Sequence, residues 1–278
     1  MAGSRLPTDP PGLHQQRSLV RLAQLDAVPS RAEVSEPHHW WRANAAYVAR
    51  AGSYRPLDGW LALGFWVFYM ALLWIQGSLL ASGLPWVGAT PHGLTVVGPG
   101  VVIELGVIAL ILRCRRQGLS DLGLHRKNAG RSALWGLGLG AAAIAGAAIV
   151  PTVIHGADFY SPSFIAGQAV WFLLWVAVPE EVVFRGFIMS RLTGFMGRVA
   201  GPIVAAVLFG LSHLPFQLAI SGLSLGDFLA QNYTMLLIPT VWGLLYGFFY
   251  AKLDNLLGPI IIHALCDLAS MGISPAAF

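Results

Sequence analysis

Apolar and polar positions divide this chain into long uncharged runs separated by short charged connections. The first run extends from residue 59 to residue 103 without any Asp, Glu, Lys or Arg, and its middle carries closely spaced Gly and Pro, which are turn signals. A helix needs about 20 apolar residues to cross a bilayer. The pattern predicts seven spans: 60–81, 94–112, 133–154, 164–191, 200–218, 232–251 and 256–273. We therefore expect an all-α fold, a polytopic transmembrane helical bundle.

The composition supports a membrane protein and excludes an ordinary soluble domain. Charged residues make up 11% of the chain and hydrophobic residues 56%, whereas soluble domains carry about 25% charged residues. The net charge of +4 is small and unevenly placed, so it indicates membrane topology and no nucleic-acid partner. Cys114 and Cys266 are far apart in the sequence and predict no disulfide framework.

The basic residues test the number and direction of the spans. All 17 Lys and Arg lie before the first span, in the connections after the second and sixth spans, or where the end of the fourth span meets the fifth. Because positively charged connections stay in the cytoplasm, we predict a cytoplasmic N-terminus and an external C-terminus. The abundance of Ala, Gly and Arg favours a bacterial source, and hence a multi-pass protein of the bacterial cytoplasmic membrane.

Three regions follow from this organisation. Residues 1–57 are expected to form a polar cytoplasmic tail, 58–158 to carry spans one to three, and 159–278 to carry spans four to seven. Within the tail, 19–25 and 40–48 have the pattern of interfacial amphipathic helices, and disorder is an equal alternative.

Ionisable side chains are rare inside the predicted spans. Such groups are costly at membrane depth, so they are expected to face the bundle interior, to pair with one another and to mark function. A structural role is the competing interpretation for each of them, as a helix cap or an interhelical hydrogen bond. The members are Glu104, Glu180, Glu181, Arg185, His213, His263 and Asp267.

The fourth span carries two adjacent carboxylates with different expected roles. Glu181 and Arg185 are spaced i,i+4 and share a helix face, which predicts an ion pair. Glu180 lies about 100° around the helix from Glu181 and is left over for general acid–base chemistry. Pro179 removes a helical hydrogen bond and can bend the helix there, which would make room for water.

Two further spans carry histidines. Phe209 lies one turn before His213 and is expected to wall the same side. His263 and Asp267 are also spaced i,i+4 on one face. Together with Glu180, these residues offer two chemistries. One is a Glu-activated water with His and Asp steadying the oxyanion. The other is a divalent metal such as zinc, held by the His and carboxylate side chains, that activates its bound water.

Three motifs in order resemble a known family. Glu-Glu-x-x-x-Arg from residue 180, Phe-x-x-x-His from residue 209 and His-x-x-x-Asp from residue 263 are similar to those of the CAAX protease and bacteriocin-processing family of intramembrane proteases. This family, also called abortive-infection-like, includes the type II CAAX prenyl endopeptidases. The resemblance covers roughly residues 164–270, and the surrounding phrases are those of its bacterial-type members.

The resemblance implies a membrane-embedded peptidase that cuts a peptide or protein substrate at the cytoplasmic membrane. Glu180 and His213 would activate water, and His263 and Asp267 would stabilise the oxyanion. The same four residues would be the ligands if the enzyme is a metalloprotease and not a glutamate-type protease. Residues that would support the site are Glu181, Arg185 and Phe209. Prenyl-protease members carry Asn at the position of Asp267, a departure that weakens the transfer of a CAAX substrate.

Two other functions are open at this point. One is a non-catalytic membrane scaffold or immunity protein of the same family, which the intact Glu180, His213 and His263 disfavour. The other is a proton-coupled transporter, which the absence of a convincing internal repeat disfavours. Nothing in the apolar spans specifies the substrate sequence or the oligomeric state, and membrane lipid is the one partner that the composition itself implies.

Overall fold

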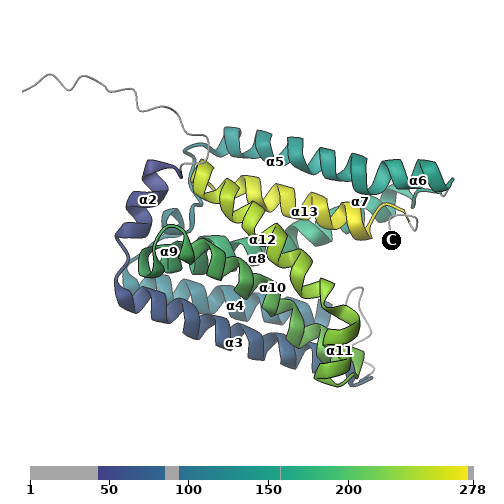
Figure 1. The fold of residues 1–278 in the computed structure, drawn as a ribbon, viewed down its shortest axis with the longest axis horizontal. Helices are drawn as coiled ribbons and strands as arrows, with labels where there is room; N and C mark the ends of the chain where they lie inside the picture. The colour runs from purple at the N-terminus through teal and green to yellow at the C-terminus, as the bar shows by residue number, and fades with distance from the viewer. Residues whose placement is uncertain (1–42, 85–93, 157, 275–278) are drawn as a thin grey trace, which may run out of the picture. The chain divides into compact units, whose positions relative to one another are not determined.

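The computed structural model describes residues 43–84, 94–156 and 158–274, and within them every regular element is helical. Five helices are long and apolar enough to cross a membrane. They are α3 (Pro56–Ala81), α4 (Leu94–Arg115), α10 (Ala200–Ser221), α12 (Thr234–Leu253) and the run Ala129–His155, which comprises α5 (Ala129–Ile144), the π-helix η3 (Ala145–Ile149) and α6 (Val150–His155). The all-α, polytopic fold expected from the sequence is confirmed, and the chain is a multi-pass membrane protein (Figure 1).

The fourth predicted span is helical along its length but is not a regular α-helix. It consists of α7 (Pro162–Trp171), the π-helix η4 (Phe172–Ala177), α8 (Val178–Glu181), the π-helix η5 (Val182–Met189) and α9 (Ser190–Met196). Pro179 lies in α8, between the two π-helical segments. Proline cannot donate to the carbonyl one turn earlier, and π-helical turns are common at functional sites. The sequence therefore located the distortion but did not predict its form.

The last predicted span is shorter than expected, and one helix was missed. Helix α13 (Leu257–Met271) has 15 residues, fewer than a straight crossing of the bilayer needs. Helix α11 (Leu225–Asn232) fills the stretch between the fifth and sixth predicted spans, where no element was expected. Ser224 caps it by accepting a hydrogen bond from the Asp227 amide at 3.2 Å.

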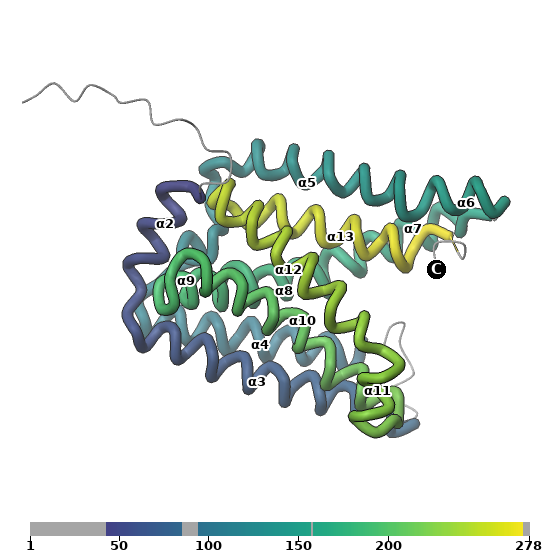
Figure 2. The backbone as a smooth tube through the Cα atoms, viewed as in Figure 1, coloured from purple at the N-terminus to yellow at the C-terminus, as the bar shows by residue number. Residues whose placement is uncertain are grey.

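Small residues allow the helices to pack closely. Helix α10 packs on α3 and on α12, and α13 packs on α5 (Figure 2). A Cβ atom at Gly210 of α10 would lie 2.5 Å from the carbonyl oxygen of Leu236 in α12, and one at Gly136 of α5 would lie 2.8 Å from that of Gly258 in α13. Such close approach of backbones is how membrane helices gain van der Waals contact.

The segment before α3 is more ordered than its polar sequence suggests. Helix α2 (Ala45–Gly52) is capped by Asn44, whose amide also donates to the Ala251 carbonyl at 2.8 Å. Arg50 pairs with Asp254 at 2.5 Å, and Tyr47 hydrogen-bonds Thr193 at 2.8 Å. Residues 45–52, placed in the cytoplasmic tail by the sequence, thus pack on α9 and α12. The predicted helix 19–25, and residues 40–42 of the second one, lie outside the described residues.

The candidate active site

Glu181 lies at the centre of a buried ion-pair network. Its Oε1 accepts a hydrogen bond from Arg185 at 2.7 Å and another from the Nδ1 of His263 at 2.8 Å. All three side chains are buried. The i,i+4 pair expected within the fourth span is present, and α13 adds His263 to it. A buried ion pair of this kind needs such additional hydrogen bonds to offset the cost of desolvation.

Aromatic rings enclose this network. The guanidinium of Arg185 lies 4.2 Å from the ring centre of Phe209 and 5.0 Å from that of Tyr246. The ring of Tyr246 stacks on that of His263 at 5.1 Å, and the ring of Phe209 meets His263 edge-on at 5.9 Å. Phe209 from α10 and Tyr246 from α12 thereby separate the network from solvent, and cation–π contacts of this kind gain strength when they are desolvated.

A cavity of about 430 Å³ lies next to the network, inside the bundle. It is amphipathic, because polar groups from α3, α4, α8, α10 and α13 face it together with Trp171, Trp175 and Phe216. Ligand pockets of ordinary enzymes have this size and character. The polar lining residues are Tyr69, Gln76, Glu104, Glu180, Ser212, His213, Gln217, His263 and Asp267.

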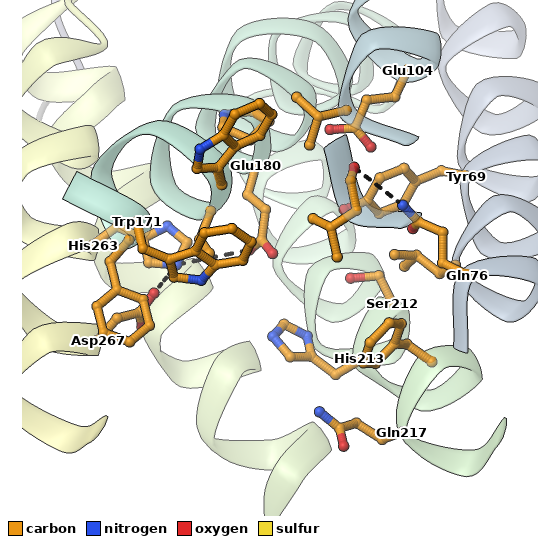
Figure 3. A pocket seen from close by; sticks show the side chains of 18 of the residues that line it. Tyr69, Gln76, Glu104, Trp171, Glu180, Ser212, His213, Gln217, His263 and Asp267 are labelled. Carbon is orange, nitrogen blue, oxygen red and sulfur yellow. Dashed lines mark hydrogen bonds and ion pairs between the residues drawn. The ribbon is translucent and has the colours of Figure 1, made fainter. Parts of the chain in front are cut away.

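Glu180 points into the cavity, unlike its neighbour Glu181. In Figure 3 its carboxylate lies between the His263–Asp267 pair and the ring of His213. Its side chain is 22% exposed, and its Oε2 lies 3.7 Å from the Nε2 of His263. No protein hydrogen bond reaches that oxygen from any residue that the structure describes. Glu180 therefore combines a buried carboxylate oxygen that no protein group satisfies with a partly exposed side chain that lines the polar cavity, a setting in which a water molecule would be held.

Both histidines are fixed through the same ring nitrogen. The Nδ1 of His213 lies 3.0 Å from the Phe209 carbonyl oxygen, and the Nδ1 of His263 lies 2.8 Å from Glu181. A carbonyl or carboxylate oxygen only accepts, so each Nδ1 carries the proton and donates. The Nε2 atom of each ring is thus left for chemistry: without a proton it acts as a base, and when the ring is protonated on both nitrogens it donates.

Asp267 lies beside His263, as the i,i+4 spacing predicted, but it does not orient the His263 ring. Its Oδ2 lies 3.5 Å from the Nε2 of His263, which is longer than a hydrogen bond. The carboxylate that orients the His263 ring is Glu181, which lies on another helix. The sequence could not reveal this, because i,i+4 spacing identifies neighbours within a helix and not between helices.

Several cavity residues come from the first two spans, which the motifs do not cover. Gln76 and Tyr69 are on α3, and Glu104 is on α4. Glu104 is 4% exposed and makes no hydrogen bond or ion pair with the described part of the chain. Its charge at membrane depth identified it in the sequence as a group expected to face the bundle interior, whereas a tyrosine or glutamine in an apolar span carries little information.

The donors do not fit a metal ion. Within the described residues, no three or more His, Cys, Asp and Glu side chains are arranged so that they could hold one. Glu180, His263 and Asp267 approach one another, but the His213 ring enters the cavity from α10 without an ion pair to any of them. The divalent metal predicted from the sequence, such as zinc, stays a prediction.

One comparison with known proteins gives a match. A family model described as Rce1-like, type II CAAX prenyl endopeptidase, matches residues 161–269. No curated protein and no solved structure matches the chain. The match confirms the resemblance found in the three motifs, and it spans all seven residues that carry them. Residues 161–269 therefore match the Rce1-like type II CAAX prenyl endopeptidase family, a family of membrane proteases.

Proposed function

We propose that the chain is an intramembrane endopeptidase in which Glu180 and His213 activate water. The observation that carries this proposal is the partly exposed side chain of Glu180, which lines the same cavity as two histidines whose Nδ1 atoms are already engaged. A hydrolase needs such a base within reach of one water molecule. The family match supports the reaction class and leaves the residue roles to be tested.

In this mechanism a water molecule lies between Glu180 and the Nε2 of His213. Glu180 takes a proton from the water as its oxygen bonds to the carbonyl carbon of the substrate. His263, protonated on both ring nitrogens with Asp267 beside it, donates from its Nε2 to the oxyanion that forms. The proton then passes from Glu180 to the amide nitrogen as the carbon–nitrogen bond breaks, which leaves a free carboxylic acid and a free amine. Glu181 and Arg185 take no part in proton transfer and hold the His263 ring in place.

The substrate is a peptide or protein segment that reaches the cavity from the membrane. Trp171, Trp175 and Phe216 provide apolar surface in the cavity for lipid-like or hydrophobic groups. The predicted orientation places the cleavage at the cytoplasmic membrane, and the bacterial source inferred from the composition would make it the bacterial cytoplasmic membrane.

Cleavage by the purified full chain in liposomes tests the proposal. Two fluorogenic probes with one sequence, a prenylated CAAX peptide and its unprenylated form, report whether the prenyl group is needed. We expect the variants Glu180→Ala, His213→Ala and His263→Ala to lose about 10²–10⁴-fold in rate, the usual contribution of acid–base groups. His155→Ala is the control, since His155 lies exposed at the end of α6.

The outcomes separate the parts of the proposal. If the three variants cleave like the parent, the site is wrongly assigned. If the parent cleaves neither probe and no other membrane-anchored peptide, the scaffold alternative gains. Complete metal removal with a chelator should leave the rate unchanged, and a loss that zinc restores would establish the metalloprotease alternative.

A further inference from the structure

A second pocket, distinct from the candidate active site, lies where α3 begins and α4 ends. Its volume is about 420 Å³. The lining is almost entirely polar, in contrast with the amphipathic cavity at Glu180. The residues are Ser53, Tyr54, Arg55, Asp58, Cys114, Arg115, Arg116, Gln117 and Asp121. We refer to these residues as the α3–α4 pocket.

Both carboxylates of the α3–α4 pocket are already satisfied by the protein. Asp58 accepts two hydrogen bonds from Arg115, at 2.9 and 3.1 Å, and one from the Arg55 amide at 2.8 Å. Asp121 accepts a hydrogen bond from the Gly118 amide at 2.7 Å. These acids are therefore occupied as structural acceptors and do not neutralise the other arginines.

Two guanidinium groups of the pocket have no partner. Arg55 and Arg116 make no side-chain hydrogen bond or ion pair with any residue that the structure describes, and Arg116 has a left-handed backbone (φ 56°). With Arg115 they set three positive charges against two negative ones in the pocket. Two free guanidiniums in one concave site match an anion with several acceptor oxygens, and phosphate is the anion that their planar donors suit best.

The surroundings of the pocket favour a lipid over a soluble anion. Next to Arg55 on α3, the side chains of Leu57 and Trp60 are 53% and 62% exposed, and Leu110 on α4 is 59% exposed. Exposed tryptophan beside basic residues is typical of the level of the lipid headgroups. A phosphate held in the pocket would thus have apolar surface next to it along which acyl chains could lie.

We propose that the α3–α4 pocket binds the phosphate of an anionic phospholipid from the adjoining leaflet. Arg55 and Arg116 provide the donors, and Arg115 is held in place by Asp58. Bound lipid would link the start of α3 to the end of α4. Gln117 of the pocket also accepts a hydrogen bond from the buried Arg191 of α9. Because Arg191 lies within residues 161–269, the bound lipid would also be connected to the segment that matches the protease family.

Native mass spectrometry of the purified full chain tests this assignment. Phosphatidylglycerol and phosphatidylcholine with identical acyl chains are titrated separately, and inorganic phosphate is added in a third arm. We expect phosphatidylglycerol to bind the parent protein at least about fivefold more tightly than phosphatidylcholine, the gain that one basic residue gives near an anionic lipid. Inorganic phosphate should compete only weakly, because it lacks the acyl chains.

Single substitutions localise the binding. Arg55→Gln and Arg116→Gln should each weaken phosphatidylglycerol binding by about fivefold. Arg113→Gln should not, because Arg113 carries the same charge at the same helix end but does not line the pocket. Equal affinity of the parent for both lipids would overturn the proposal without use of any variant. Equal losses from all three variants would replace the pocket with a diffuse surface charge, and full displacement by inorganic phosphate would replace the lipid with a free anion.

Discussion

Glu180 and Glu181 are adjacent in the sequence, but the structure gives them opposite surroundings. Glu181 is enclosed by Arg185, His263 and the rings of Phe209 and Tyr246, so that one of its oxygens accepts two hydrogen bonds. The side chain of Glu180 is 22% exposed and lines a cavity, whereas that of Glu181 is fully buried.

We call the surroundings of Glu181 the closed side and those of Glu180 the open side. A rotation of about 100° between consecutive helical residues is enough to separate a structural carboxylate from one that can react. The comparison teaches that charge at membrane depth is not one category. Its function depends on whether the carboxylate is enclosed by a counter-ion and aromatic rings, as at Glu181, or lines a cavity, as at Glu180.

Disruption of the closed side should cause the largest loss of folding stability. Glu181→Gln leaves Arg185 as a buried charge without its counter-ion, and removal of one partner of a buried pair costs about 3–5 kcal/mol. We expect a large drop in the thermal unfolding temperature of the purified protein. Asp158→Asn removes a carboxylate from an exposed position and should have little effect. A loss below about 1 kcal/mol, as for exposed ion pairs, would mean that the network is not structural.

A smaller loss of stability is expected from a substitution at the contact between α10, which lines the cavity, and α12. Gly210→Ala would bring a Cβ atom to 2.5 Å from the Leu236 carbonyl oxygen and push α10 away from α12. Overpacking of this kind costs about 1–3 kcal/mol, measurable by the same thermal unfolding. Gly64→Ala in α3 meets open space and is the matched control. Equal stability of both variants would contradict the close contact of α10 with α12.

The smallest effect is expected at the departure from the family pattern. Asp267→Asn keeps a side chain of the same size that can donate and accept, and a neutral hydrogen bond contributes about 0.5–1.5 kcal/mol. We expect the cleavage rate to change by about tenfold or less. A loss of a hundredfold or more in steady-state cleavage would show that the carboxylate itself is required, as a proton donor or as a metal ligand.

Much of the helical framework could be predicted from sequence, because apolar length and basic connections reflect the bilayer directly. The prediction was less successful where contacts between helices determine the local structure and which side chains meet. The π-helical turns beside Pro179 and the short helix α11 were missed. Spacing along one helix predicted the pair of Glu181 with Arg185, but only the fold brings His263 to Glu181 and Glu104 to the cavity.

The most direct test of the difference between the closed and the open side compares the stability and the activity of two variants, one at Glu180 and one at Glu181. Glu180→Gln and Glu181→Gln are isosteric changes, and each variant is assayed for unfolding temperature and for cleavage of the peptide probes in liposomes. We predict that Glu180→Gln unfolds at the temperature of the parent and loses about 10²–10⁴-fold in cleavage rate. If Glu180→Gln instead cleaves at the rate of the parent, Glu180 is not the base, and the central claim is wrong.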